Sequence, residues 1–247
     1  MRIAPVTAAI LLLASPSNID PLLSAADRVF EIALGSVVGL AVAILVFPAR
    51  AHGTLVDKAA QTITLLAEVL RNMLADLDGS RDEAAFARLH ERIRASLAEA
   101  ETAGVEAGRE RSSHLTDDPD PATLLRAIRR LRHTVILIGR ASTEPLPEPA
   151  LPHFLEPLHR IDDAMAEYLV SLSRSIQRRL PPPSPEAVNA ALDGYDQAML
   201  LVWKQPRTRD MPLDAVGRIF ALSFALEQLR ENARDLRDRA AELMHVR

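Results

Sequence analysis

Hydrophobic residues recur with alternating spacings of three and four along most of the chain beyond residue 51. Residues spaced in this way lie on one face of an α-helix, so the pattern predicts amphipathic helices that pack through this face. Six such stripes of hydrophobic residues follow one another, beginning near Leu55, Phe86, Leu124, Phe154, Val188 and Ala215. The last stripe, over residues 215–243, is the most regular. The pattern therefore predicts an all-α fold.

Prolines and aspartates mark where these helices are expected to begin and end. Residues 118–119 and 120–121 are both Asp-Pro, and they are alternative starts for the third helix. Aspartate caps a helix N-terminus, and proline fits the first turn. Four prolines within residues 144–152 predict a loop. The three prolines of residues 181–183 predict the end of the next helix.

The connections between the predicted helices are short, and short connections favour antiparallel neighbours. Residues 51–247 are therefore expected to form an antiparallel multi-helix bundle, and this domain is long enough to bury its own core. A second chain is the alternative partner for part of the hydrophobic stripes.

The first 50 residues have a different character, because two long apolar runs replace the amphipathic pattern. A membrane-spanning helix needs about 20 apolar residues, with about 17 as a lower limit. Residues 29–47, whose single charge is Glu31, reach that lower limit, and residues 3–19 come close to it. We interpret residues 1–50 as a membrane hairpin. A signal peptide is the alternative for the first run, since Arg2 precedes it and small residues follow.

Positive charges predict how the hairpin is oriented. Arg2 precedes the first run, and Arg50 and Lys58 follow the second. Because Lys and Arg are enriched on the cytoplasmic side of membrane proteins, both ends of the hairpin are expected there. The domain of residues 51–247 would then be cytoplasmic, and membrane lipids would surround residues 1–50 of a multi-pass protein.

The second apolar run carries two features that bear on function. Gly35, Gly39 and Ala43 are four residues apart and share one helix face, where small residues let another helix approach closely. The alternative is that small residues are simply common in membrane helices. Arg28 and Glu31 lie at the entry of the run and can form an i,i+3 ion pair. They are either transport-related charges or an interfacial pair.

Composition excludes several classes of function. With 33 acidic and 29 basic residues the formal net charge is −4, which argues against a nucleic-acid binder, because such proteins carry a basic excess. Cysteine is absent, and the nine glycines form no phosphate-binding loop. The seven histidines are scattered, and no catalytic motif is present. We therefore predict no enzymatic activity, catalytic residue, metal site or cofactor.

One predicted helix has a local charge bias. Residues 121–143 contain no acid, and Arg126, Arg129, Arg130 and His133 share one face, opposite the hydrophobic stripe. Three interpretations are open. The face is solvated and paired with acids of neighbouring helices, or it contacts anionic lipid headgroups, or it guides an organic anion towards the membrane.

The order of these elements resembles a known family. An arginine-initiated, glycine-containing run that ends in Phe-Pro, residues 28–48, precedes a long helical region. This order is similar to that of the fusaric acid resistance (FUSC) and aromatic acid exporter family. Residues 131–141 and 220–230 resemble the cytoplasmic part of that family, and residues 2–15 resemble its preceding span. The similarity extends over essentially the whole chain and consists mainly of helix patterns.

The resemblance implies efflux of aromatic carboxylic acids or related toxic compounds across the bacterial inner membrane, with a periplasmic adaptor as a partner. Members of the family carry a larger block of spans before each cytoplasmic region, whereas this chain has the pattern of only two. The chain is thus expected to correspond to the C-terminal part of such a permease, completed by a missing transmembrane portion or by homo-oligomerisation. A membrane-anchored helical interaction module without transport activity is the alternative.

Overall fold

The computed structural model describes residues 21–46, 51–75, 83–113, 119–142, 146, 150–205 and 211–243. Within these residues the chain forms seven helices and no strand, which confirms the predicted all-α class. The chain divides into two compact units, residues 1–49 and residues 50–247.

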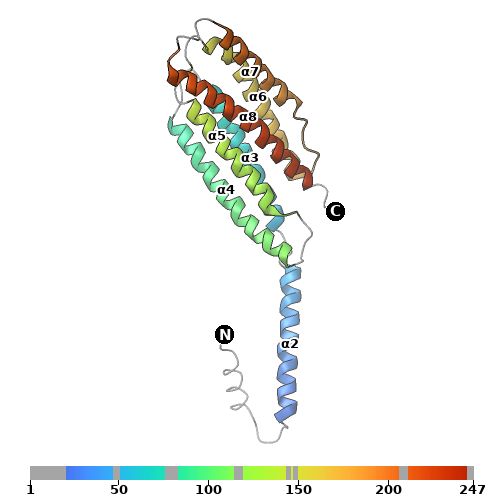
Figure 1. The fold of residues 1–247 in the computed structure, drawn as a ribbon. Coiled ribbons are helices and arrows are strands. Elements are labelled where there is room, and N and C mark those ends of the chain that lie inside the picture. The colour runs from blue at the N-terminus through green and yellow to red at the C-terminus, as the bar shows by residue number, and fades with distance from the viewer. Residues whose placement is uncertain are drawn as a thin grey trace. The chain divides into compact units, whose positions relative to one another are not determined.

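The described part of the first unit is the helix α2 (Pro21–Val46), shown in Figure 1. Its large apolar side chains are unusually exposed: those of Val29, Phe30, Ile32, Leu34, Val37, Val38 and Val42 are between 50% and 70% accessible. The predicted span of residues 3–19 lies outside the described residues. So do Phe47 and the side chains at positions 40, 41 and 43–46.

No helix in the described part of the chain has both the length and the apolar character needed to cross a membrane.

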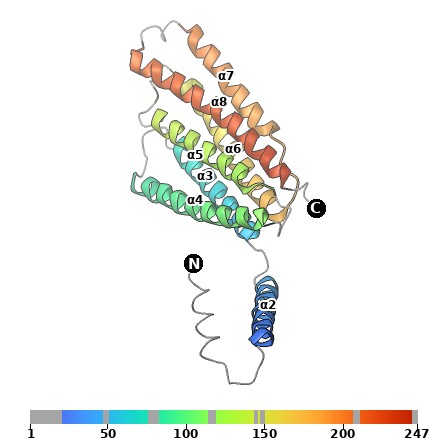
Figure 2. The same ribbon diagram turned by 60° about the horizontal axis from the view of Figure 1, so that its bottom comes forward.

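The described residues of the second unit form six helices that pack into a bundle (Figures 1 and 2). They are α3 (Ala51–Ala75), α4 (Glu83–Ser112), α5 (Pro121–Ala141), α6 (Leu151–Arg178), α7 (Glu186–Lys204) and α8 (Leu213–Glu242). The helices α4, α3, α6 and α7 contact one another in that order. The helices α5 and α8 pair with each other, with α5 against α3 and α4 and α8 against α6 and α7. The bundle therefore has a layer of four helices covered by a layer of two.

The hydrophobic stripes are buried between these helices, as the sequence predicts. In α8, for example, Ile219, Leu222, Leu229 and Leu236 are all 0% exposed. One continuous core receives side chains from all six helices. Burial of these aliphatic side chains is the main source of stability in such a bundle, at roughly 1.5–3 kcal/mol for each large side chain. Phe86, near the start of the second stripe, is only partly buried against this core.

A few hydrogen bonds between side chains cross the helix interfaces. The Thr62 and Ser96 hydroxyl oxygens lie 2.8 Å apart between α3 and α4. The Asn232 amide of α8 donates a hydrogen bond to Thr134 Oγ1 of α5, also at 2.8 Å. Because a buried polar group is costly without a partner, these bonds favour one register of each helix pair over others.

The helix ends agree with most of the predicted signals. Asp120 caps α5, and its Oδ1 accepts a hydrogen bond from the Ala122 backbone N–H at 3.1 Å, so the second of the two alternative starts is the real one. The helix α6 ends at Arg178, before the three prolines. The predicted loop of residues 144–152 is wrong at its end, since α6 begins at Leu151 and includes Pro152. Proline at that place fits because the N–H groups of the first turn need no partner within the helix.

Candidate functional site

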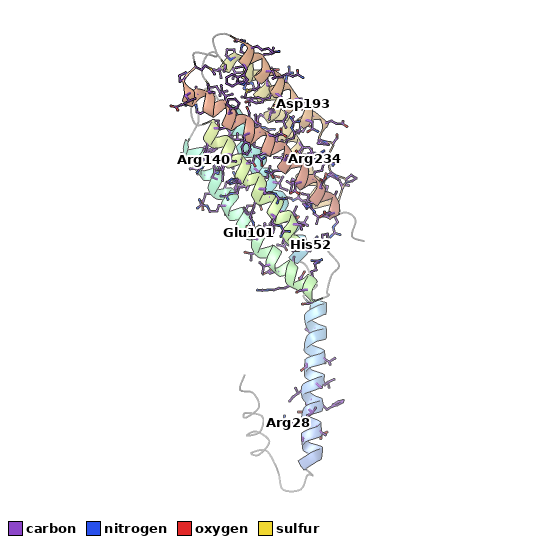
Figure 3. The ribbon with its side chains drawn as sticks, in the orientation of Figure 1. Arg28, His52, Glu101, Arg140, Asp193 and Arg234 are labelled. Atoms are coloured by element: carbon purple, nitrogen blue, oxygen red, sulfur yellow. The ribbon has the colours of Figure 1, made fainter. Side chains whose placement is uncertain are left out.

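The charges at the start of the apolar run form an ion pair on α2. Arg28 Nη1 lies 3.2 Å from Glu31 Oε2, which is the i,i+3 pairing that the sequence suggests. Both side chains are exposed (Figure 3 labels Arg28), and such a pair contributes at most about 1 kcal/mol in water. The pairing is consistent with either interpretation of these charges.

Gly35 and Gly39 lie on an open surface of α2. Apart from the helix's own backbone, no described atom comes within 4 Å of a Cβ built at either position. The side chain of Ala43 lies outside the described residues. A role for these positions in packing against another membrane helix stays a prediction.

The basic face of α5 is solvent-exposed, and half of it is neutralised by neighbouring helices. Arg129 Nε lies 2.9 Å from Glu101 Oε1 of α4, and Arg130 pairs with Asp235 of α8. Figure 3 labels Glu101. Arg126 and His133 are also exposed, and they have no ion pair among the described residues. Two of the four residues thus fit the interpretation of a solvated face paired with acids.

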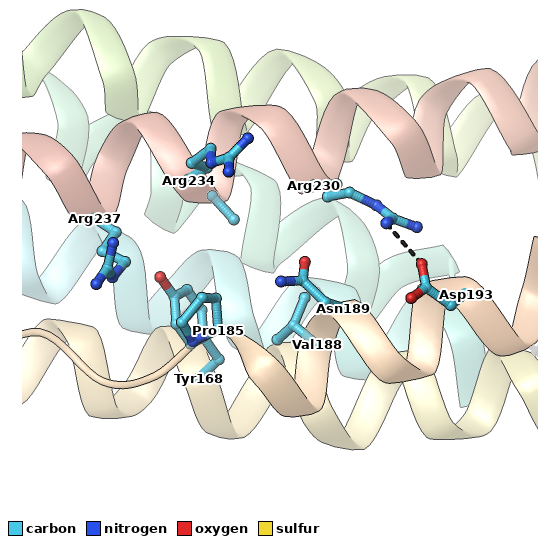
Figure 4. A pocket seen from close by; sticks show the side chains of 9 residues that line it. Tyr168, Pro185, Val188, Asn189, Asp193, Arg230, Arg234 and Arg237 are labelled. Atoms are coloured by element: carbon cyan, nitrogen blue, oxygen red, sulfur yellow. Dashed lines mark hydrogen bonds and ion pairs between the residues drawn. The ribbon is translucent and has the colours of Figure 1, made fainter.

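A second group of arginines lines a pocket between α6, α7 and α8 (Figure 4). Arg230, Arg234 and Arg237 come from α8, Tyr168 comes from α6, and Asn189 comes from α7. The cavity volume is ≈ 340 Å³, which lies at the lower end of the range for small-molecule sites. This pocket is the candidate functional site of the bundle.

Acids neutralise the Arg230 end of the pocket. Arg230 lies 2.8 Å from Asp193 and 3.3 Å from Asp196, both on α7, and 3.4 Å from Glu227 on its own helix. Figure 4 marks the contact with Asp193. Burial opposes the charge of Arg230. The hydrogen bond to Asp193 and the nearby carboxylates outweigh that effect and raise the pKa of Arg230 above its ordinary value. This end repels anions.

The other end of the pocket holds groups with unused hydrogen-bonding capacity. Tyr168 is 5% exposed, yet its Oη has no hydrogen-bond partner among the described residues, and the same is true of Arg237 Nε. Figure 4 shows the Tyr168 hydroxyl directed towards α8. Burial raises the pKa of Tyr168 to about 12, opposed by the charge of Arg237 and assisted by that of Asp238. Its hydroxyl is therefore protonated at neutral pH and can donate.

Arg234 and Asn189 complete this end of the pocket. Arg234 is exposed and has no ion-pair partner in the described part of the chain, whereas Arg237 lies 3.5 Å from Asp238. Asn189 lies in the first turn of α7, where backbone N–H groups carry partial positive charge. The arrangement supplies hydrogen-bond donors from three helices and has the chemistry of an anion site.

Sequence reasoning missed this pocket, although one signal was available. Arg230, Arg234 and Arg237 are spaced i, i+4 and i+7, so they share one face of the last helix, as the basic residues of α5 do. The partners from α6 and α7 have no such signal, because only the packing of the bundle brings them to α8. No group of three or more potential metal ligands occurs among the described side chains.

Comparison of the chain with protein families and with curated proteins finds no match. The resemblance to the FUSC and aromatic acid exporter family therefore stays a prediction based on the residues quoted for it.

Proposed function

We propose that the chain corresponds to the C-terminal part of an inner-membrane efflux permease of the FUSC and aromatic acid exporter type, which exports aromatic carboxylic acids or related toxic compounds. The observation that carries this proposal is the exposure of the large apolar side chains of α2. An apolar surface of that extent is normally covered by protein or lipid.

The distribution of those side chains around α2 favours lipid over a soluble partner. At 100° per residue, Phe30, Val42 and Ile32 lie about 80–160° apart around the helix axis, and Val29 occupies a further side. A helix that packs on the surface of a soluble protein has one apolar stripe, whereas a helix that is apolar all round is a core helix or a membrane span. A membrane span over residues 29–47, part of which lies outside the described residues, would satisfy this requirement within a membrane hairpin.

In this proposal the bundle of α3–α8 is an antiparallel cytoplasmic domain that supports assembly or gating. Arg50, directly before α3, and Lys58, within α3, agree with that orientation. A single hairpin is too small to enclose a transport pathway, so further membrane helices from other copies, or from a missing transmembrane portion, would complete it. A periplasmic adaptor would be a partner on the opposite side of the membrane.

The glycines of α2 offer a test of this proposal. Replacing Gly35 and Gly39 with leucine should block close helix packing, and with it membrane assembly and resistance of a sensitive bacterial host to aromatic acids. Gly53→Leu is a matched control, because Gly53 is also helical and a Cβ there meets nothing within 4 Å. Assembly and resistance that are unchanged in the two α2 variants would refute the packing role.

A second candidate function is a membrane-anchored interaction module without transport activity. The observation in its favour is that the bundle closes around its own continuous core within residues 50–247. Deletion of residues 1–47 separates the two candidates. A bundle that stays soluble and binds the same partner as the full chain supports the module. Loss of that partner supports the integrated permease.

A further inference from the structure

We infer that the pocket between α6, α7 and α8 binds a small organic acid with one negative charge, held through its carboxylate by Tyr168, Arg234 and Arg237. Neither membrane insertion of α2 nor transport is needed for this binding. The cavity, the buried Tyr168 hydroxyl without a partner among the described residues, and the distribution of charge along the pocket support such a site.

The Tyr168 hydroxyl is the first reason to expect a ligand. A buried hydroxyl without a hydrogen bond loses its interactions with water and gains nothing in return. Tyr168 is 5% exposed, lines the cavity and directs its Oη towards α8 (Figure 4). A phenylalanine would fill the same space without that cost. A ligand oxygen in the cavity would give the hydroxyl an acceptor.

Charge identifies the ligand as an anion and fixes where it lies. The carboxylates of Asp193, Asp196 and Glu227 all lie next to Arg230, and their negative charges repel an anion from that end of the pocket. Arg237 and Arg234 line the remainder, next to Tyr168. The side chains of Tyr168, Arg234 and Arg237 all offer N–H or O–H donors. A carboxylate oxygen is a strong acceptor for such donors, because its negative charge strengthens each hydrogen bond.

The same charges favour one negative charge over two. Asp238 already lies 3.5 Å from Arg237, so among the described residues Arg234 is the cation of this pocket without a carboxylate partner. A monoanion balances that charge, whereas a phosphate dianion would also face the repulsion of Asp193 and Asp238. The N-terminal turn of α7, which contributes Val188 and Asn189, adds a weaker attraction through the positive end of the helix dipole, while the Asn189 N–H itself donates to the Pro185 carbonyl oxygen at 2.9 Å.

The pocket also has space for a short apolar body next to the carboxylate. Part of the pocket lining is apolar and comes from Pro185, Val188 and Ala233. The cavity volume of ≈ 340 Å³ exceeds that of a carboxylate group alone. Butyrate is therefore a suitable probe, and butyramide is its uncharged counterpart of nearly the same shape.

The experiment is equilibrium dialysis of radiolabelled butyrate against the full chain in detergent micelles, with empty micelles as the blank. Saturable binding of one butyrate per chain is expected. Butyramide should not compete, and inorganic phosphate should compete less well than butyrate. Arg234→Gln should weaken binding about tenfold or more, which is the usual effect of losing one charge-assisted hydrogen bond. Arg234 is exposed, so this variant should keep the fold.

Two further variants keep the result interpretable. Tyr168→Phe should weaken butyrate binding several-fold and yet raise the thermal stability of the unliganded chain, because it removes a buried hydroxyl that no described residue hydrogen-bonds. Arg88→Gln, at an exposed arginine of α4 outside the pocket, should change neither property. Absence of saturable binding, an equal loss in Arg88→Gln, or full binding by Arg234→Gln would overturn the site. Tighter binding of phosphate than of butyrate would overturn the assignment of a single charge.

Discussion

The two units of the chain use the same kinds of apolar residue in opposite ways. In the bundle, Ile63, Leu169 and Leu222 are 0% exposed because neighbouring helices of the same chain cover them. On α2, Val37 is 63% exposed and Phe30 is 70% exposed, and the described residues offer them no cover. Apolar side chains of this number are costly to keep in water, so the first unit depends on something outside the described chain. The bundle does not.

This difference separates two sources of stability. The bundle should unfold and refold as a unit whose stability depends on its own packing. The helix α2 should be stable only where lipid or other apolar surface surrounds it, because an isolated helix gains little from its backbone hydrogen bonds alone.

The largest expected effect is the loss of a core side chain. Leu169→Ala should lower the unfolding free energy of the bundle by about 2–5 kcal/mol, because it removes buried methyl groups and leaves a cavity. Val37→Ala on α2 is the contrasting variant and should leave the unfolding of the bundle nearly unchanged. Denaturant unfolding of the full chain, followed by circular dichroism, measures both. Equal losses from the two variants would mean that α2 is part of the same cooperative unit.

A smaller effect is expected where the bundle buries a carboxyl group. Asp162 of α6 is 6% exposed, and its Oδ1 has no hydrogen-bond partner among the described residues. Burial, aided by the charge of Asp163, raises the pKa of Asp162 to about 7 against the opposing charge of Arg71. Folding then favours the protonated form. The stability should fall as the pH rises from about 4, the pKa in the unfolded chain, to about 7, and stay low above that.

Asp162→Asn removes this penalty. It should raise the unfolding free energy by about 1–3 kcal/mol at pH 8 and change it little near pH 4. The exposed neighbour gives a matched control, since Asp163→Asn should have only a small effect at either pH. Thermal unfolding across the pH range measures this. The assigned direction of the pKa shift would be contradicted if the unmodified chain became more stable between pH 4 and pH 7 and Asp162→Asn removed that rise.

The smallest effect concerns the rim of the bundle. A double-mutant cycle of Arg129→Ala and Glu101→Ala should give a coupling energy below about 1 kcal/mol, and salt should reduce it, because both groups are exposed. Arg126→Ala, at the same face but without an ion pair in the described part of the chain, should show no coupling to Glu101. A coupling well above 1 kcal/mol would show that this face contributes to the fold as the core does.

The sequence predicted well those features that depend on neighbours along the chain. The stripe of residues 215–243 predicted the buried face of α8. The two Asp-Pro pairs limited the start of α5 to two alternatives, of which the pair at residues 120–121 is the start observed. The start of α6 at Leu151 was missed, because proline is compatible with a first helical turn as well as with a loop.

Features that depend on packing between distant helices could not be predicted in the same way. Arg129 and Arg130 gave a visible basic face, but their partners Glu101 and Asp235 come from two other helices. The pocket at Tyr168 joins α6, α7 and α8, and no spacing within one helix reveals such a meeting. The Tyr168 hydroxyl has no hydrogen-bond partner among the described residues, and this depends on the side chains that surround it in the bundle.

The central claim is that the exposed apolar surface of α2 contacts lipid whereas the bundle is surrounded by water. Since the chain has no cysteine, single substitutions can carry a nitroxide spin label without further changes. Val37→Cys on α2 and Val105→Cys on α4 are matched sites, because these valines are 63% and 56% exposed on helices. In reconstituted vesicles, the label at position 37 should be accessible to oxygen and shielded from a water-soluble nickel relaxation agent, and the label at position 105 should show the reverse. Equal accessibility of both labels to the nickel agent would contradict the account.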